Sequence, residues 1–181
     1  MNHLCSSQLL LISMSNLSKL SDYNVSSCKC SACRMACMVS PCFGTPEDMQ
    51  KLIDAGYQDR LLPTIYMNPE TLEEYPVIAP IGINFVGALH RCTFLDSDMN
   101  CELHDKNLKP TEGKLAYHGR DEEQNVNLRI MICNTWNSLK GVEIVRKTID
   151  HLENNIVKDL EHDTVSISST ERAEEVHNTN T

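Results

Sequence analysis

The hydrophobic pattern of residues 46–55 predicts a helix. Thr45 suits the N-cap because its hydroxyl can accept a hydrogen bond from a free amide of the first turn. Gly56 suits the position after the last turn, where the backbone often takes a positive φ. The apolar side chains recur at i, i+3 and i+4, as Met49, Leu52 and Ile53.

Residues 141–161 show a longer amphipathic pattern, which predicts a second helix. Its apolar positions, spaced at i, i+4, i+7, i+11 and i+15, are Val145, Ile149, Leu152, Ile156 and Leu160. Residues 128–136 are also apolar and include the only tryptophan, Trp136, so we expect them in the core as either strand or helix. The polar residues 119–127 before them are predicted to form a loop.

The middle of the chain predicts irregular structure and short strands. Residues 57–76 contain three prolines and are expected to be irregular. Residues 77–95 are rich in β-branched side chains but are interrupted by proline and glycine, which favours two short strands. Residues 91–104 read as strand, polar turn and strand, which predicts a β-hairpin. Pro110 is expected to open a short helix or turn.

Together these elements predict an α+β fold, a small metal-centred domain over residues 28–162 between disordered termini. Residues 1–27 are rich in Ser and Asn and are expected to be a disordered leader, in which Met14 is an alternative start. Residues 163–181 are predicted to be a disordered acidic tail. The leader lacks the basic and apolar regions of a signal peptide, and no apolar run reaches the roughly 20 residues of a membrane span. We therefore expect a cytoplasmic protein that does not enter the membrane.

The charge and motif content argue against several functions. With 25 acidic and 16 basic residues the chain has a formal net charge of −9, which disfavours binding to nucleic acid. The sequence contains no G-x-G-x-x-G, P-loop or G-x-S-x-G motif. An enzyme is therefore not the first expectation, and protein partners stay open.

Nine cysteines are the main candidates for chemistry. Five of them fall between residues 28 and 42, and an odd, clustered set favours metal ligands over a disulfide framework. Cys30 and Cys33 have the C-x2-C spacing that lets two thiolates reach one ion. A single wrapped loop could supply three or four sulfurs from this first group of candidate ligands, in which Cys28 is either a ligand or a spare thiol: Cys28, Cys30, Cys33, Cys37 and Cys42.

A second group of candidate ligands lies further along the chain. Cys92 and Cys101 occupy facing ends of the predicted hairpin, and His104 follows three residues later. His118 is a further candidate, whereas Cys5 and Cys133 are expected to be bystanders. Soft thiolates select zinc, Cu(I) or iron–sulfur clusters, and we expect zinc or an iron–sulfur cluster here.

The cysteine cluster and several short motifs together resemble the bacterial YkgJ-like family. The motifs are the Thr-Pro-Glu helix entry, Arg91-Cys92-Thr93-Phe94-Leu95, Cys101-Glu102-Leu103-His104 and Leu108-Lys109-Pro110. This CxxCxxCC family is described as zinc- or iron-chelating, and flagellin lysine-N-methylases are related to it. The resemblance covers residues 28–120 and implies metal binding without supplying a reaction. The family has a cysteine three residues after the Lys/Arg-Pro pair, where this chain has Gly113, and His118 could replace that ligand.

Three functions follow as hypotheses. The first is a metal-binding protein with zinc or an iron–sulfur cluster in a Cys/His centre. The second is a metalloenzyme, or an accessory protein related to iron–sulfur-dependent protein methylation, which would need an open coordination position. The third is a metal-free thiol or disulfide protein, in which the cysteines would be oxidised in pairs.

Overall fold

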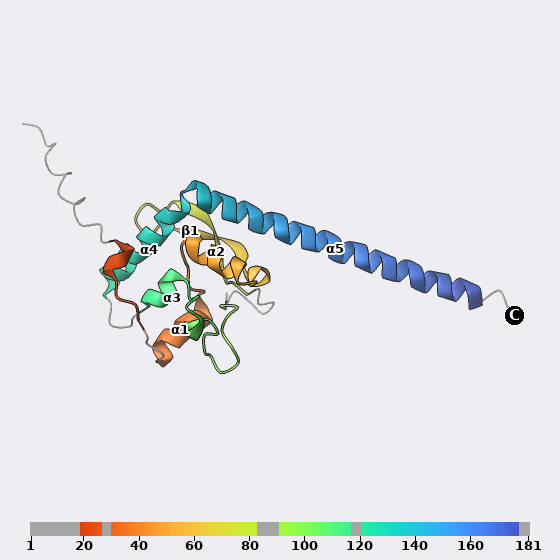
Figure 1. Cartoon of the computed structure of the whole chain (residues 1–181), viewed down its shortest axis with the longest axis horizontal. Helices are drawn as coiled ribbons and strands as arrows, with labels where there is room; N and C mark the ends of the chain where they lie inside the picture. Colours follow the sequence, from red (N-terminus) through yellow and green to blue (C-terminus); the bar gives the residue numbers. More distant parts are fainter. Residues whose placement is uncertain (1–18, 27–29, 83–90, 117–120, 178–181) are drawn as a thin grey trace, which may run out of the picture.

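The computed structural model describes residues 19–26, 30–82, 91–116 and 121–177, and only the backbone from residue 159 onward. Its fold is α+β, as predicted, with helices around a two-stranded antiparallel sheet (Figure 1). In chain order the longer elements are α1 (Ser31–Val39), α2 (Pro46–Asp54), β1 (Leu62–Met67), β2 (Glu74–Ala79), α3 (Thr111–Leu115), α4 (Glu122–Trp136) and α5 (Leu139–His177). Short 3-10 turns are η1 (Leu20–Asp22), η2 (Gln58–Arg60) and η3 (His104–Lys106).

The sheet lies where the sequence predicted irregular structure. Strands β1 and β2 pair from Leu62 opposite Ala79 to Met67 opposite Glu74, so the expectation for residues 57–76 is wrong. The prolines in the sequence argue against strands, but both strands of a two-stranded sheet are edge strands. An edge strand tolerates Pro63 and Pro76, whose missing amides are not needed by a further neighbour.

The hairpin predicted at residues 91–104 is reduced to single bridges. Cys101 pairs with Leu95, but Cys92 pairs with Ile81 instead of facing Cys101. The polar turn between the two is present, because the Asp96 carboxylate accepts hydrogen bonds from backbone amides two and four residues later. Of the two strands predicted within residues 77–95, the end of β2 is present, and residues 83–90 lie outside the described part.

Helix α2 begins and ends as predicted. The Thr45 hydroxyl accepts from the Asp48 amide at 3.3 Å, and the Asp48 carboxylate accepts from the Thr45 amide at 3.1 Å. After the last turn Gly56 has a φ of 83°, the left-handed conformation in which glycine is favoured. The same Asp48 carboxylate also accepts from the Thr111 amide and pairs with Lys114 at 2.9 Å, which fixes α3 against α2.

Helix α4 resolves the apolar stretch 128–136 as helical. It begins earlier than predicted, at Glu122, because the Asp121 carboxylate caps it by accepting from the Gln124 amide at 2.7 Å. The expectation of a loop over residues 119–127 is therefore wrong from Glu122 onward. Cys133 is buried in this helix, as expected for a small apolar residue.

The predicted helix over residues 141–161 is confirmed as part of α5, which is longer at both ends. Its first part packs on the domain and the remainder projects away from it (Figure 1). The backbone stays helical to His177, beyond residue 162, where we placed the end of the domain. Among the described residues, no helix combines the length and the apolar character needed to cross a membrane.

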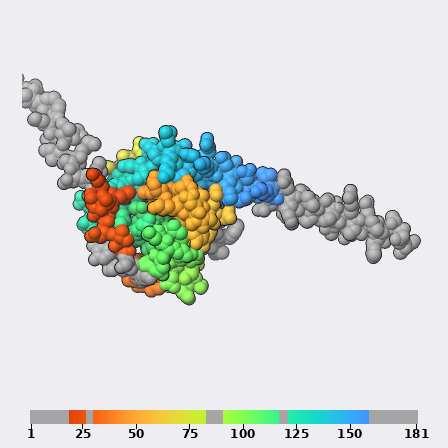
Figure 2. Space-filling model, in the orientation of Figure 1, coloured from red at the N-terminus to blue at the C-terminus, as the bar shows by residue number. Residues whose placement is uncertain are grey.

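The hydrophobic core lies between the sheet and helices α2, α4 and α5. Two contacts extend it toward the cysteine-bearing side. The Phe43 ring stacks on Tyr66 with centroids 4.0 Å apart, and the Trp136 indole donates to the Gly44 carbonyl at 2.8 Å. On the face seen in Figure 2, α2 lies directly beside residues 91–116, and the first half of α5 crosses above them. The core thereby supports the segment that carries the candidate ligands.

Candidate metal centre

Cys33 and Cys37 of the first cysteine group lie on a helix rather than on the wrapped loop that we expected. Cys30 occupies the N-cap of α1. Cys33 and Cys37 lie four residues apart on α1, a spacing that places two side chains on one helical face. Cys42 follows two residues after the C-cap, Ser40, where the chain turns back toward α2. Because α1 ends between them, Cys37 and Cys42 come close together.

Cys37 and Cys42 form a close thiol pair, with their Sγ atoms 3.6 Å apart. The hydrogen bond from Cys42 lowers the pKa of Cys37 to about 7, against the effect of burial and with help from the charge of Lys109. The same bond and burial raise the pKa of Cys42 well above its ordinary value. The pair therefore holds one proton readily and releases the other near neutral pH.

Cys92 and Cys101 reach the same region from a distant part of the sequence. The Cys92 amide donates to the Cys37 carbonyl at 3.1 Å, which ties its segment directly to α1. Burial raises the pKa of Cys92 to about 12, and the charges of Cys37 and Cys101 also raise it. Burial raises the pKa of Cys101 as well. Without a metal ion, both sulfurs stay protonated thiols at neutral pH.

Arg60 holds the segment that bears these two cysteines. Its guanidinium pairs with the Glu102 carboxylate at 2.7 Å, beside Cys101, and donates to the Thr93 carbonyl, beside Cys92. It also lies over the Phe94 ring, 4.2 Å from the centroid. The Thr93 hydroxyl returns a hydrogen bond to the Arg60 carbonyl at 2.9 Å. One arginine therefore fixes the segment at two points.

Four cysteines and one histidine line a single cavity of about 400 Å³. We call it the thiol cavity; these five lining residues are Cys33, Cys37, Cys42, Cys101 and His104. His104 lines it from η3, and Cys92, which is not a lining residue, interacts electrostatically with Cys37 and Cys101. Cys30 is not among the lining residues. Cys28 and His118 lie outside the described residues, as does Cys5.

Gly113 closes the thiol cavity on the side of α3. A Cβ atom at this position would lie 3.1 Å from the Cys42 sulfur and 3.3 Å from its Cβ. The absence of a side chain therefore lets α3 approach Cys42 closely. The position at which the resembled family carries a cysteine thus faces the thiols directly. Whether His118 replaces that ligand stays a prediction.

Two cationic side chains line the thiol cavity, Arg34 and Lys109. Arg34 donates to the Asn100 side chain at 3.3 Å, but its buried Nε has no hydrogen-bond partner. A buried donor left without a partner costs free energy, so an acceptor next to it would be favoured. Thiolate sulfur is such an acceptor, and two nearby positive charges offset the negative charge of clustered thiolates.

The donor chemistry suits a thiophilic metal ion, but the ligand atoms are not preassembled. Within the described ranges, no group of three or more Cys, His, Asp or Glu side chains is already arranged to hold a metal. A hydrogen bond joins the Cys37 and Cys42 thiols directly. Four thiols and an imidazole around one cavity nevertheless provide the soft ligands that zinc and iron–sulfur clusters prefer. A bound metal would have to draw these sulfurs inward.

Sequence reasoning missed the charged residues around the cysteines. Arg34 is adjacent to Cys33, and Glu112 follows the Lys109-Pro110 motif by two residues, so proximity to the motifs was a usable signal. Arg129 lies on α4, far from any cysteine motif, and nothing in the sequence indicated its position. Long-range packing of α3 on α4 brings it to this side of the domain.

The comparisons with known proteins add no relative. No model of a known protein family, no curated protein and no solved structure matches the chain. The resemblance to the YkgJ-like family therefore stays a prediction that rests on the motifs quoted above.

Proposed function

We propose that this protein binds a metal through the sulfurs of the thiol cavity, as zinc or as an iron–sulfur cluster. The observation that carries the proposal is convergence. Cys33 and Cys37 come from α1, Cys42 from the following turn and Cys101 from a segment almost 60 residues later, yet all line one cavity. Thiols scattered through a core as apolar filler would not gather in this way.

The charges around the cavity support the same proposal. Several thiolates together carry a negative charge that must be compensated, and a metal cation supplies most of that compensation. Arg34 and Lys109 would supply the remainder from the cavity wall.

The ligand set allows two kinds of centre. Four thiolates would complete a tetrahedral zinc site or hold an iron–sulfur cluster. His104 lines the same cavity and could replace one sulfur, which would favour zinc or a mixed Cys/His cluster. We propose Cys33, Cys37, Cys42 and Cys101 as the ligands, with Cys92 and His104 as the next candidates.

A second candidate function rests on the Cys37–Cys42 pair. Their sulfurs lie 3.6 Å apart, so a small movement would bring them to disulfide distance. In that case the cysteines would cycle between dithiol and disulfide without a metal. An external oxidant would have to remove the two electrons and two protons.

Purification under anaerobic conditions, followed by elemental analysis and a visible spectrum, separates these outcomes. Brown protein with iron and acid-labile sulfide would identify a cluster, and colourless protein with stoichiometric zinc would identify a zinc site. Protein that neither retains nor rebinds either metal contradicts the proposal. In that case, a Cys37–Cys42 disulfide found by mass spectrometry after aerobic purification would support the second candidate.

A further inference from the structure

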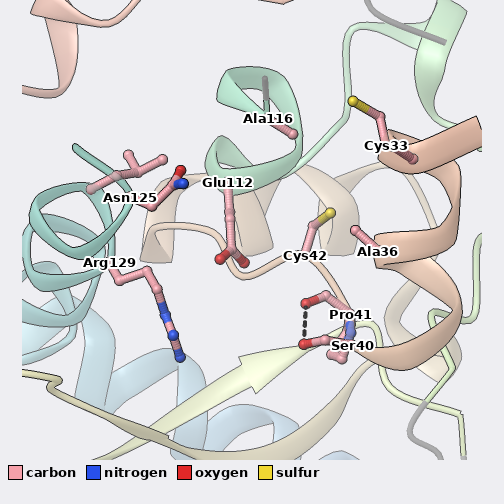
Figure 3. A pocket seen from close by; sticks show the side chains of 11 residues that line it. Cys33, Ala36, Ser40, Pro41, Cys42, Glu112, Ala116, Asn125 and Arg129 are labelled. Atoms are coloured by element: carbon pink, nitrogen blue, oxygen red, sulfur yellow. Dashed lines mark hydrogen bonds between the residues drawn. The ribbon is translucent and has the colours of Figure 1, made fainter. Parts of the chain in front are cut away.

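A second cavity of about 340 Å³ shares Cys33 and Cys42 with the thiol cavity, and Figure 3 shows the residues that line it. We call it the Glu112 cavity. Its volume falls in the range of small-molecule sites, roughly 300–1,000 Å³. Alanine, proline and leucine side chains form much of its wall: Ala32, Ala36, Pro41, Ala116 and Leu128. The cavity therefore offers an apolar surface to a ligand that is smaller than a nucleotide.

Two opposite charges face this apolar space. Glu112 extends from α3 into the middle of the cavity, and Arg129 lines it from α4 (Figure 3). One oxygen of the Glu112 carboxylate accepts from the Phe43 amide at 2.7 Å, and burial raises the pKa of the carboxyl group. That amide bond fixes the orientation of the carboxylate and leaves its second oxygen for another donor.

Glu112 and Arg129 do not neutralise each other by direct contact. The Arg129 Nε donates to the Tyr66 hydroxyl at 3.3 Å, and the guanidinium lies over the Tyr66 ring at 5.5 Å. Within the described part of the chain, no ion pair involves Glu112 or Arg129. The terminal guanidinium nitrogens are therefore available to an anion, while the carboxylate faces the same cavity.

A separated pair of opposite charges around an apolar space is complementary to a zwitterion. We propose that the Glu112 cavity binds a small amino acid-like molecule, with its carboxylate at Arg129 and its ammonium group at Glu112. The apolar body of the molecule would pack against Leu128 and the alanines. A ligand with one charge would leave either the carboxylate or the guanidinium uncompensated, and would bind more weakly.

This site goes beyond the proposed metal centre and does not depend on it. Cys33 and Cys42 line both cavities, so a bound zwitterion would lie next to the thiols. Its binding can nevertheless be measured whether or not a metal is present. A metal-free protein that binds the zwitterion would refute the metal centre alone, and a metal-loaded protein that binds none would refute this site alone.

The test is titration calorimetry on the full chain with matched probes. L-leucine and γ-aminobutyrate are the zwitterions, and they differ in the separation of their charges. The analogues 3-methylbutylamine and 4-methylpentanoate keep the leucine body but have one charge each. At least one zwitterion should bind about tenfold more tightly than both analogues. No binding of either zwitterion up to about 10 mM, or equal affinity for all four probes, would overturn the proposal.

Two variants assign the charges. In Arg129→Gln the zwitterion should bind no more tightly than 3-methylbutylamine. In Glu112→Gln it should bind no more tightly than 4-methylpentanoate. Gln keeps an oxygen that can accept from the Phe43 amide, so Glu112→Gln should keep the local fold. Arg146→Gln and Glu122→Gln remove exposed charges outside the cavity and are the matched controls. A loss of affinity in the controls equal to that in the cavity variants would also overturn the proposal.

Discussion

The two sides of this domain differ in how completely their groups are satisfied. On the side of the sheet, α2, α4 and α5 bury apolar residues, and the polar Asp48 carboxylate has three partner residues: Thr45, Thr111 and Lys114. On the side of α1, no helix residue is fully buried, and the Arg34 Nε is buried without a partner. Stability therefore resides on the sheet side. An unsatisfied buried donor such as the Arg34 Nε is characteristic of a binding site.

Electrostatics separates the two sides in the same way. The pKa of Asp48 is lowered although burial would raise it, because hydrogen bonds from Thr111 and Lys114 stabilise its charge. On the other side, the pKa values of Cys92 and Cys101 are raised, because burial is not offset by comparable partners. The Asp48 carboxylate has all its partners within the protein, so its network is structural. The thiols lack a comparable counter-charge, and a bound ligand would have to supply it.

The largest stability effect is expected on the sheet side. Leu52→Ala removes a fully buried side chain of α2 and should lower the free energy of unfolding by about 3 kcal/mol. Urea denaturation followed by circular dichroism measures the change. Metal content of the folded protein should stay unchanged. Loss of metal in this variant without loss of stability would break the division between the two sides.

A smaller effect is expected where Asp48 joins α2 to α3. Asp48→Asn replaces a buried carboxylate, which accepts hydrogen bonds and pairs with Lys114, by an uncharged amide. The substitution should lower the free energy of unfolding by about 2 kcal/mol. The folded pKa of Asp48 is lowered, so its contribution is present above the unfolded pKa near 3.9 and is lost as pH falls through the folded pKa. Urea curves of both proteins should therefore converge on acidification. A difference independent of pH would contradict this account.

The smallest perturbation is chemical labelling of the thiol side. In metal-free reduced protein, Cys37 should be alkylated by iodoacetamide faster than Cys92, with a rate that rises through about pH 7. Cys92 is buried and has a pKa of about 12, so it should stay unlabelled under native conditions. Peptide mass spectrometry over a pH series measures both. Equal labelling of the two at pH 7 would contradict the asymmetry of the cluster.

Local signals predicted the elements whose cause is local. The capped helix α2 and the amphipathic α5 follow from side-chain spacing and from Thr45 and Gly56. The β1–β2 hairpin was missed because prolines within a segment argue against a strand. The sheet has only two strands, so both are edge strands that tolerate proline, and the sequence does not show this. The helical form of α1 was missed because metal-type cysteine spacing suggested a loop.

The site was predicted in part for the same reason. Clustering along the chain identified Cys33, Cys37 and Cys42, and the spacing after Cys101 identified His104. Cys30 was predicted with equal weight but is not among the residues that line the thiol cavity. The contributions of Arg60 and Arg129 depend on packing between segments far apart in the chain, which spacing does not encode.

The most direct test of the metal centre is the metal content of two matched variants purified anaerobically. Cys37→Ser replaces a thiol that lines the thiol cavity, and Cys133→Ser replaces a buried thiol in the core. Zinc and iron per folded protein should stay at the wild-type value in Cys133→Ser and fall by at least about half in Cys37→Ser, since each lost ligand weakens the site. Equal metal content in all three proteins would contradict the account.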